Sequence, residues 1–197
     1  HYPEKDIIEL EEHSHLGASM KALFETALRE SPDCIIIEEF RGVGEAMEAI
    51  RACTRGHFGS MASAHFNNAE EAIEGTAMMM LEEGLTLPLE LAKLRVARAF
   101  NIVVQMYGDA ITGIKKITSI TEIYVDSNNK IHYIPLIEWL PCGEDYMGEG
   151  KWVFKNYPSE KLTSHMRRTI SSKELEDVGL KAMVKLPQPK GKGLLGW

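Results

Sequence analysis

Residues 31–68 decide the fold of this chain, and they read SPDCIIIEEFRGVGEAMEAIRACTRGHFGSMASAHFNN. After a Pro-Asp turn, residues 34–37 form an uninterrupted apolar run. Such a run is typical of a strand buried on both faces, as in a parallel sheet covered by helices. Glu38 and Glu39 end this run. In open α/β sheets ligands bind outside the carboxyl ends of the strands, so the stretch predicts an α/β fold with a site at this acid pair.

The rest of the stretch predicts a helix and a second strand. Residues 44–53 have apolar side chains at helical spacing, and a strand-like run then lies between His57 and His65. Because the spacing of the histidines is even, an unbroken strand would place both on one face, although Gly59 permits a bend. Strand, acid pair, helix, strand and histidine in this order indicate a nucleotide hydrolase.

Two segments of this stretch resemble motifs of one known family. Residues 32–42, PDCIIIEEFRG, look like the Walker B segment of the type II and type IV secretion ATPase superfamily, which also contains type IV and Flp pilus motors. Residues 55–72, RGHFGSMASAHFNNAEEA, are similar to the histidine box of that family. The resemblance extends to about residue 123. It implies a RecA-like α/β fold, namely a mostly parallel sheet with flanking helices that forms the C-terminal half of a P-loop ATPase domain.

The resemblance also implies roles for single residues. Glu39 matches the Walker B glutamate, which polarises a water molecule or holds Mg²⁺ through its water shell. Arg41 matches the arginine that follows it, and His65 matches a histidine that contacts the γ-phosphate or couples it to domain closure. The implied catalytic set is therefore Glu39, His65 and Arg41, and the implied nucleotide-binding set is His57, Asn67 and Arg55.

Each of these roles competes with a structural one. Glu39 can be a solvated acid at a strand end, and His65 can be a neutral histidine satisfied in a polar cleft. Arg41 and Arg55 suit phosphate through the guanidinium fork, but either can form an ordinary salt bridge. Glu38 is interpreted as non-catalytic, because adjacent residues of a strand point to opposite faces.

The sequence departs from the family at three points. Glu38 stands where the family has glycine, and Arg55 stands where it has threonine. The phosphate-binding pattern G-x-x-x-x-G-K-[ST] is also missing, since Lys151 and Lys192 follow glycines but precede tryptophan and glycine. We therefore expect the C-terminal half of a motor domain that hydrolyses no ATP by itself, with ATP and Mg²⁺ binding belonging to the complete protein.

The resemblance implies partners as well. The complete protein is expected to form a homohexamer in the cytoplasm and to reach the membrane through the inner-membrane platform proteins of a secretion or pilus system. There it would couple ATP hydrolysis to protein transport or pilus assembly. A catalytically silent RecA-like scaffold for protein–protein interaction is the alternative, and the departures at residues 38 and 55 favour it weakly.

Composition narrows the class of protein. The 197 residues are 44% hydrophobic and 26% charged, as in an ordinary globular chain. The net charge of −7 argues against nucleic-acid binding, which needs clustered Lys and Arg. No apolar run approaches the length of a membrane span. Cys34, Cys53 and Cys142 have no C-x-x-C spacing, and the first two are expected to be buried, reduced thiols.

The remaining segments predict a core domain, residues 1–126, and a β-rich C-terminal extension with a flexible tail, residues 127–197. A His-x-His pair at residues 13 and 15 can bind metal, but a solvated loop is favoured. Residues 78–80 are three methionines, interpreted as a core-facing turn. The expected helices are 19–29, 68–83, 88–100 and 159–175, and the expected strands are 6–11, 102–104, 117–125, 131–140 and 152–154.

Overall fold

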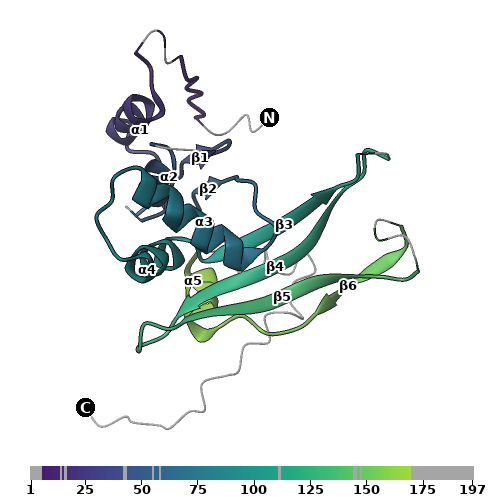
Figure 1. The fold of residues 1–197 in the computed structure, drawn as a ribbon. Coiled ribbons are helices and arrows are strands. Elements are labelled where there is room, and N and C mark those ends of the chain that lie inside the picture. The colour runs from purple at the N-terminus through teal and green to yellow at the C-terminus, as the bar shows by residue number, and fades with distance from the viewer. Residues whose placement is uncertain are drawn as a thin grey trace. The chain divides into compact units, whose positions relative to one another are not determined.

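The computed structural model describes residues 6–13, 15, 17–41, 44–54, 56–57, 59–110, 112–143, 146 and 148–169. Arg55, the predicted tail and the end of the predicted helix 159–175 lie outside these residues. The elements, labelled in Figure 1, are α1 (Met20–Arg29), β1 (Ile36–Ile37), α2 (Ala46–Thr54), β2 (Met61–Ala62), α3 (Ala69–Glu82), α4 (Leu89–Ala99), β3 (Ile102–Gly108), β4 (Lys115–Val125), β5 (Ile131–Pro141), β6 (Gly150–Phe154) and α5 (Glu160–Thr169).

The strands form two sheets, which confirms the predicted α/β class. One is a parallel pair of β1 and β2, and the other has the strand order β3-β4-β5-β6, with β5 antiparallel to β6. The chain divides into two compact units, His1–Gln105 with Ile123–Tyr133, and Met106–Glu122 with Ile134–Trp197. The predicted division at residue 126 stays a prediction.

The parallel pair is shorter than expected. Ile36 pairs with Met61 and Ile37 with Ala62. Only Ile37 of β1 is buried, whereas Ile36 is 67% exposed and Cys34 is exposed. The prediction that residues 34–37 are buried on both faces, with Cys34 in the core, is therefore wrong. The apolar run signalled a strand correctly, but among the described residues helices cover one face of it only.

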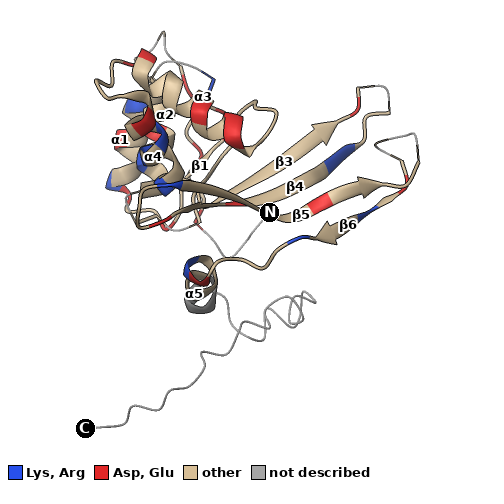
Figure 2. Ribbon diagram, turned by 60° about the horizontal axis from the view of Figure 1, so that its bottom comes forward, with Lys and Arg blue, Asp and Glu red and all other residues tan. Residues whose placement is uncertain are grey.

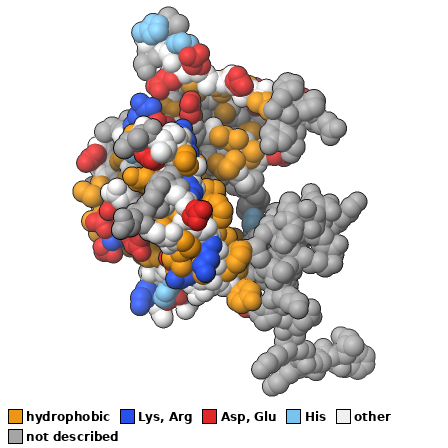
Figure 3. All heavy atoms as spheres, turned by 90° about the vertical axis from the view of Figure 1, so that its right-hand side faces the viewer, with side chains coloured by type: hydrophobic (Ala, Val, Ile, Leu, Met, Phe, Trp, Pro, Cys, Tyr) orange, Lys and Arg blue, Asp and Glu red, His pale blue; other side chains and the backbone are white. Residues whose placement is uncertain are grey.

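The strand predicted at residues 6–11 from alternating apolar and polar side chains is also wrong. These residues form no strand, and Ile7 and Ile8 are each 61% exposed. An isolated run of alternating residues is not stable without a neighbouring strand to pair with, and within the described part of the chain none pairs with this one. Apolar side chains reach the surface elsewhere too, among acidic and basic ones (Figure 3).

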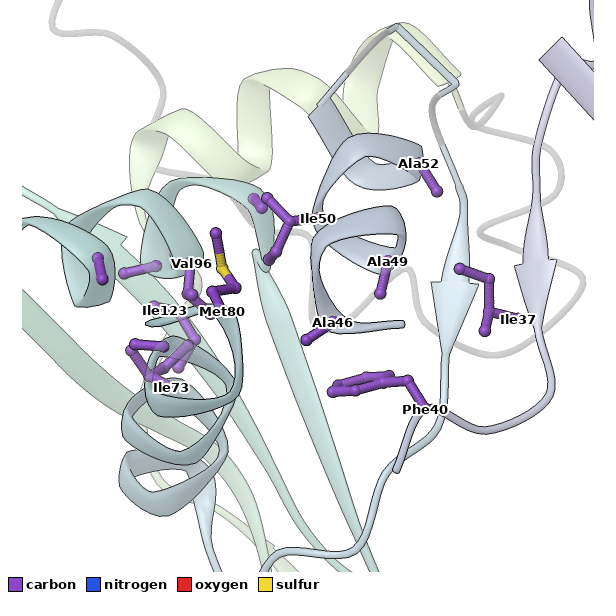
Figure 4. Packing of buried hydrophobic residues seen from close by; sticks show 14 of the residues in the cluster. Ile37, Phe40, Ala46, Ala49, Ile50, Ala52, Ile73, Met80, Val96 and Ile123 are labelled. Atoms are coloured by element: carbon purple, nitrogen blue, oxygen red, sulfur yellow. The ribbon is translucent and has the colours of Figure 1, made fainter. Parts of the chain in front are cut away.

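The hydrophobic core of the first unit lies between its helices and the parallel pair. Helix α2 contacts α1, α3 and α4, and α3 packs along α4. Figure 4 shows Ile37 and Phe40 on the side of the alanines of α2, whose small side chains allow close approach. Met80 is fully buried and Met79 partly so, while Met78 is 49% exposed. The methionine turn thus faces the core, as predicted, with one residue outward.

Side-chain caps fix where the helices begin. The hydroxyl of Ser19 accepts a hydrogen bond from the third residue of α1, and Oδ1 of Asn68 accepts one from the N–H of Glu71 at 2.8 Å. Both caps confirm the predicted helix starts. Helix α2 begins differently, because the carboxylate of Glu83 at the end of α3 accepts its first two N–H groups at 3.0 and 3.1 Å. Sequence reasoning did not predict that long-range cap.

In the second unit, aromatic and charged side chains order the sheet. The ring centroids of Trp139 and Trp152 lie 4.8 Å apart on β5 and β6, and the Nζ atom of Lys116 lies 3.6 Å from the Trp139 ring. The buried carboxylate of Glu122 accepts hydrogen bonds from the N–H and hydroxyl of Ser159, just before α5. Lysines and acids also lie along these strands (Figure 2).

Candidate active site

The two predicted motifs meet at one edge of the parallel pair. Glu39 follows β1 and His65 follows β2, and the carboxyl ends of parallel neighbours lie on the same side. Backbone pairing continues past the strands, since the N–H of Phe40 donates to the carbonyl of Ser63 at 3.0 Å. The hydroxyl of Ser63 also donates to the carbonyl of Glu38. These bonds hold the two loops together and set the positions of the side chains beyond them.

Glu39 is the centre of the site. Its Oε2 atom accepts a hydrogen bond from Nη2 of Arg41 at 2.5 Å, and its Oε1 atom lies 2.9 Å from Nε2 of His65. Both carboxylate oxygens are therefore engaged. The structure thus brings together all three residues that the sequence predicted as catalytic.

The three side chains differ in exposure. Glu39 is 18% exposed, whereas Arg41 is 76% and His65 is 91% exposed. The hydrogen bond from Arg41 holds the pKa of Glu39 below its ordinary value, and His65 adds to this effect. Reciprocally, Glu39 raises the pKa of Arg41. At neutral pH the site is an ionised carboxylate beneath two exposed, nitrogen-bearing side chains, an arrangement that can orient water and contact an anion.

Glu45 belongs to the same loop and was not predicted. Its Oε2 atom accepts a hydrogen bond from the backbone N–H of Arg41 at 2.6 Å. Because Glu45 lies one residue before α2, this bond anchors the backbone of Arg41 to the start of that helix. A carboxylate four residues after an arginine was the available sequence signal, but the same spacing is common on helices and does not identify a loop anchor. Glu38 is exposed, and its backbone carbonyl accepts the hydrogen bond from Ser63.

His57 lies at the other end of β2. Its Nδ1 atom is 2.7 Å from the carbonyl oxygen of Pro32, and the side chain is half-buried. Next to it, the hydroxyl of Ser60 accepts a hydrogen bond from the N–H of Ile35 at 3.0 Å and donates to the His57 carbonyl at 2.7 Å. These contacts tie together the segments that enter the two strands. Because β2 has only two residues, the histidines do not share one strand face.

Asn67 takes part in the start of α3. Its side-chain nitrogen donates to Oε2 of Glu71 at 2.7 Å, and its backbone N–H donates to the same oxygen at 3.2 Å. Glu71 in turn is held by Asn68, so the three residues form one capping cluster. The nucleotide-binding role predicted for Asn67 and His57 stays a prediction, and Arg55 lies outside the described residues.

The water-mediated contact of Glu39 with Mg²⁺ stays a prediction. No group of three or more His, Cys, Asp or Glu in them is arranged to hold a metal ion. Glu39 offers a single carboxylate, and a guanidinium beside it disfavours direct coordination of a cation. Separately, no helix in the described ranges is long and apolar enough to cross a membrane.

Comparison with known sequences decides the family. A sequence model described as "Type II/IV secretion system protein" matches residues 2–112, which is more than half of the chain. The chain belongs to this family. The match includes Glu39, Arg41 and His65, so the predicted resemblance to secretion ATPases is confirmed. Nucleotide and Mg²⁺ use are general features of the secretion ATPases in this family.

Similar proteins come from type IV secretion systems. The chain is 31% identical over 90 residues to the type IV secretion system protein PtlH of Bordetella pertussis and equally to its homolog in Bordetella parapertussis, covering 45% of this chain and 26% of each relative. It is also similar to the crystal structure of the VirB11 ATPase from the Brucella suis type IV secretion system in complex with sulphate, with 30% identity, a TM-score of 0.45, and coverage of 51% of this chain and 30% of that one. The chain thus spans about a quarter of the length of the curated relatives it matches.

Proposed function

We propose that this chain is part of a motor subunit that hydrolyses ATP to drive protein secretion or pilus assembly. The observation that carries the proposal is the contact of Glu39 with both Arg41 and His65 at one strand edge. Residues from two motifs that are distant in the sequence converge there on one carboxylate. Family membership supports the same function.

In this proposal Glu39 orients the attacking water. An ionised carboxylate at the end of a strand can accept a hydrogen bond from that water, which polarises the O–H bond and makes the water oxygen a better nucleophile toward the phosphate. Arg41 and His65 each take one acceptor position of the carboxylate, so a histidine that moves away gives water freer access to Oε1 of Glu39. His65 is the side chain with the most freedom, since 91% of it is exposed.

His65 would then link the nucleotide to the carboxylate. A γ-phosphate near this edge competes with Glu39 for Nε2 of His65, and its capture of the histidine releases Oε1 for water. Arg41 stays on Oε2 and keeps the carboxylate ionised, or turns its exposed fork to phosphate. His57, Asn67 and Arg55 are proposed to line the nucleotide site. If the complete protein binds Mg²⁺, Glu39 would hold it through the water shell of the ion.

The partners follow from the same proposal. The complete protein is proposed to act as a cytoplasmic homohexamer, with the phosphate-binding loop supplied outside these residues. It would act peripherally at the membrane through the inner-membrane platform proteins of a secretion, type IV pilus or Flp-pilus system. The domain boundary near residue 126 is proposed to separate the ATPase core from a β-rich extension.

A silent scaffold is the second candidate. Glu38 and Arg55 depart from the family motif, and Asn67 and His57 both make structural hydrogen bonds. In a scaffold, the Glu39 cluster would serve only to hold two loops together.

ATP turnover by the complete protein distinguishes the motor from the silent scaffold. We expect Glu39→Gln to retain ATP binding and to lose turnover by about 100-fold or more, the range of a catalytic acid or base. Glu38→Gln is the matched control, because Glu38 is the neighbouring exposed carboxylate, and its turnover should stay within a few-fold of the unaltered protein. A complete protein without ATP turnover contradicts the motor and supports the scaffold. Turnover that is unaffected by Glu39→Gln contradicts the role given to Glu39.

A further inference from the structure

Helix α4 presents an unusual outer stripe. Leu91, Leu94, Arg95 and Arg98 stand at positions i, i+3, i+4 and i+7, which lie along one side of a helix. Leu91 is 51% exposed, and both arginines are exposed. The other side of the helix is fixed in the core of the first unit through its buried residues Ala92, Val96, Ala97 and Ala99. The stripe therefore faces outward on a rigid support.

The stripe forms the floor of a groove. An open concavity of about 490 Å³ is lined by the four stripe residues together with Thr54 at the end of α2 and Asn129 in the turn between β4 and β5. We call this concavity the α4 groove. Its lining is mostly apolar, with two guanidinium groups beside two leucines. A groove of this composition suits a partner segment that carries both aliphatic and charged side chains.

The walls of the groove are well ordered by local bonds. The turn that carries Asn129 is closed by Asp126, whose Oδ1 atom accepts the N–H groups of Asn128 and Lys130 at 2.8 and 2.9 Å. The Thr54 hydroxyl donates to the carbonyl of Ile50 at 2.8 Å. The groove is therefore preformed, which lowers the entropic cost of binding a partner.

Charge distinguishes the groove from its surroundings. Arg51 on α2 pairs with Glu48, and Lys93 on α4 lies 3.3 Å from Glu74. In contrast, neither arginine of the groove pairs with a carboxylate of the described residues, and Arg98 donates only to the neutral Oδ1 of Asn129 at 2.7 Å. Basic residues of α4 lie near the acidic ones of α3 (Figure 2). In a chain of net charge −7, two uncompensated arginines beside the exposed Leu91 and the half-buried Leu94 indicate a surface that meets carboxylates from outside.

We propose that the α4 groove binds an acidic amphipathic helix of a partner protein. Leucines of the groove would take the apolar face of that helix, and Arg95 and Arg98 would each take a carboxylate, because a guanidinium fork matches a carboxylate with two parallel hydrogen bonds. A second copy of this chain would also offer carboxylates, such as the exposed Glu70 of α3, and sedimentation of the chain tests that occupant. Nucleic acid is less favoured because the groove holds only two cations over an apolar floor. This inference goes beyond ATP hydrolysis and does not depend on it.

Peptide binding to the 197-residue chain tests the proposal. The probe is a fluorescein-labelled, 14-residue helical peptide with leucines on one side and glutamates flanking them, and the control peptide has glutamine at every glutamate. Measured by anisotropy at low salt, the acidic peptide should bind at least about 10-fold tighter than the glutamine peptide. Binding of the acidic peptide should weaken as salt rises.

Variants localise the binding. Arg95→Ala and Arg98→Ala should each weaken binding of the acidic peptide by about 10-fold, and Leu91→Gln should weaken binding of both peptides. Arg29→Ala removes an exposed arginine at the end of α1 and is the matched control, which should bind as the unaltered chain does. Circular dichroism checks that each variant is folded.

Four outcomes overturn the proposal. The first is equal binding of both peptides, and the second is equal loss in Arg29→Ala and Arg95→Ala. The third is sedimentation that shows self-association of the chain abolished by Arg95→Ala, since the groove would then be an interface between copies. The fourth is the absence of measurable binding of the acidic peptide.

Discussion

Nε2 of His65 lies 2.9 Å from Oε1 of Glu39, across the edge where two parallel strands end. Nη2 of Arg41 lies 2.5 Å from the other oxygen. A carboxylate that is shared in this way is held in place by one residue of its own loop and by one residue of the neighbouring loop. The contact with Arg41 keeps the carboxylate charged. The contact with His65 can be exchanged for a ligand, because His65 is almost fully exposed.

The first prediction concerns pH. The pKa of Glu39 in the folded protein lies below the ordinary value of 4.5, chiefly because of Arg41. Its contribution to stability is therefore fully present above pH 4.5 and is lost as the pH falls through the lowered pKa. Arg41→Gln should move the titration midpoint of the Glu39 carboxyl upward, as measured by NMR. Arg29→Ala should leave that midpoint unchanged. If Arg41→Gln did not move it, the guanidinium would not be the cause of the lowered pKa.

The second prediction separates the two histidines. His57→Ala removes a hydrogen bond from a half-buried site and should lower the free energy of unfolding by about 1 kcal/mol. His65→Ala removes an exposed side chain and should leave the free energy of unfolding within about 0.5 kcal/mol. In the complete protein, however, His65→Ala should lose most ATP turnover while ADP affinity stays nearly unchanged. Chemical denaturation and nucleotide titration measure both quantities. A destabilised His65→Ala protein that loses affinity for ADP and ATP equally would contradict the proposed contact of His65 with the γ-phosphate.

The third prediction concerns the capping cluster of α3. Asn68→Ala deletes the N-cap and should lower the free energy of unfolding by about 1 kcal/mol. Asn67→Ala should cost less, because the Asn67 side chain bonds to Glu71 rather than to an N–H of the helix. Chemical denaturation measures the free energy of unfolding of both variants. A larger cost for Asn67→Ala would show that Asn67, and not Asn68, governs the start of the helix.

The fourth prediction concerns Gly75, where alanine should have the opposite effect to the one that helix propensity alone predicts. Alanine in place of an interior helical glycine ordinarily stabilises by about 0.5–1 kcal/mol. At Gly75 of α3, however, a Cβ atom would lie 2.3 Å from Cε1 of Phe66, the residue after His65. Gly75→Ala should therefore lower the melting temperature, whereas Met78→Ala on the exposed side of α3 should change it little. An increase in the melting temperature of Gly75→Ala would mean that Phe66 moves aside at no cost.

Local signals in the sequence predicted much of this fold. Asn68 with acids in the next turn marked the start of α3, and alternating β-rich residues around a polar turn marked β4 and β5. Motif order placed Glu39 and His65 after neighbouring strands, and the structure brings them into contact. Each of these signals depends on residues close in the sequence or on a recognised motif.

Other features had no local signal. Burial of an apolar run depends on what covers it, so residues 34–37 suggested two buried faces where Ile36 is exposed. The cap that Glu83 places on α2 joins two helices that only the fold brings together. Likewise, the even spacing of His57 and His65 suggested one strand face, yet the strand between them has two residues. Tertiary contacts decided all three.

A double-mutant cycle on Glu39 and His65 tests the central claim most directly, namely that the two residues act as one unit in ATP hydrolysis. Turnover of the complete protein is measured for Glu39→Gln, for His65→Ala and for the double variant. If the residues act together, the double variant should lose about as much as the more severe single variant, because either change alone disables the unit. Losses that multiply in the double variant would mean that Glu39 and His65 act independently, and would contradict the account.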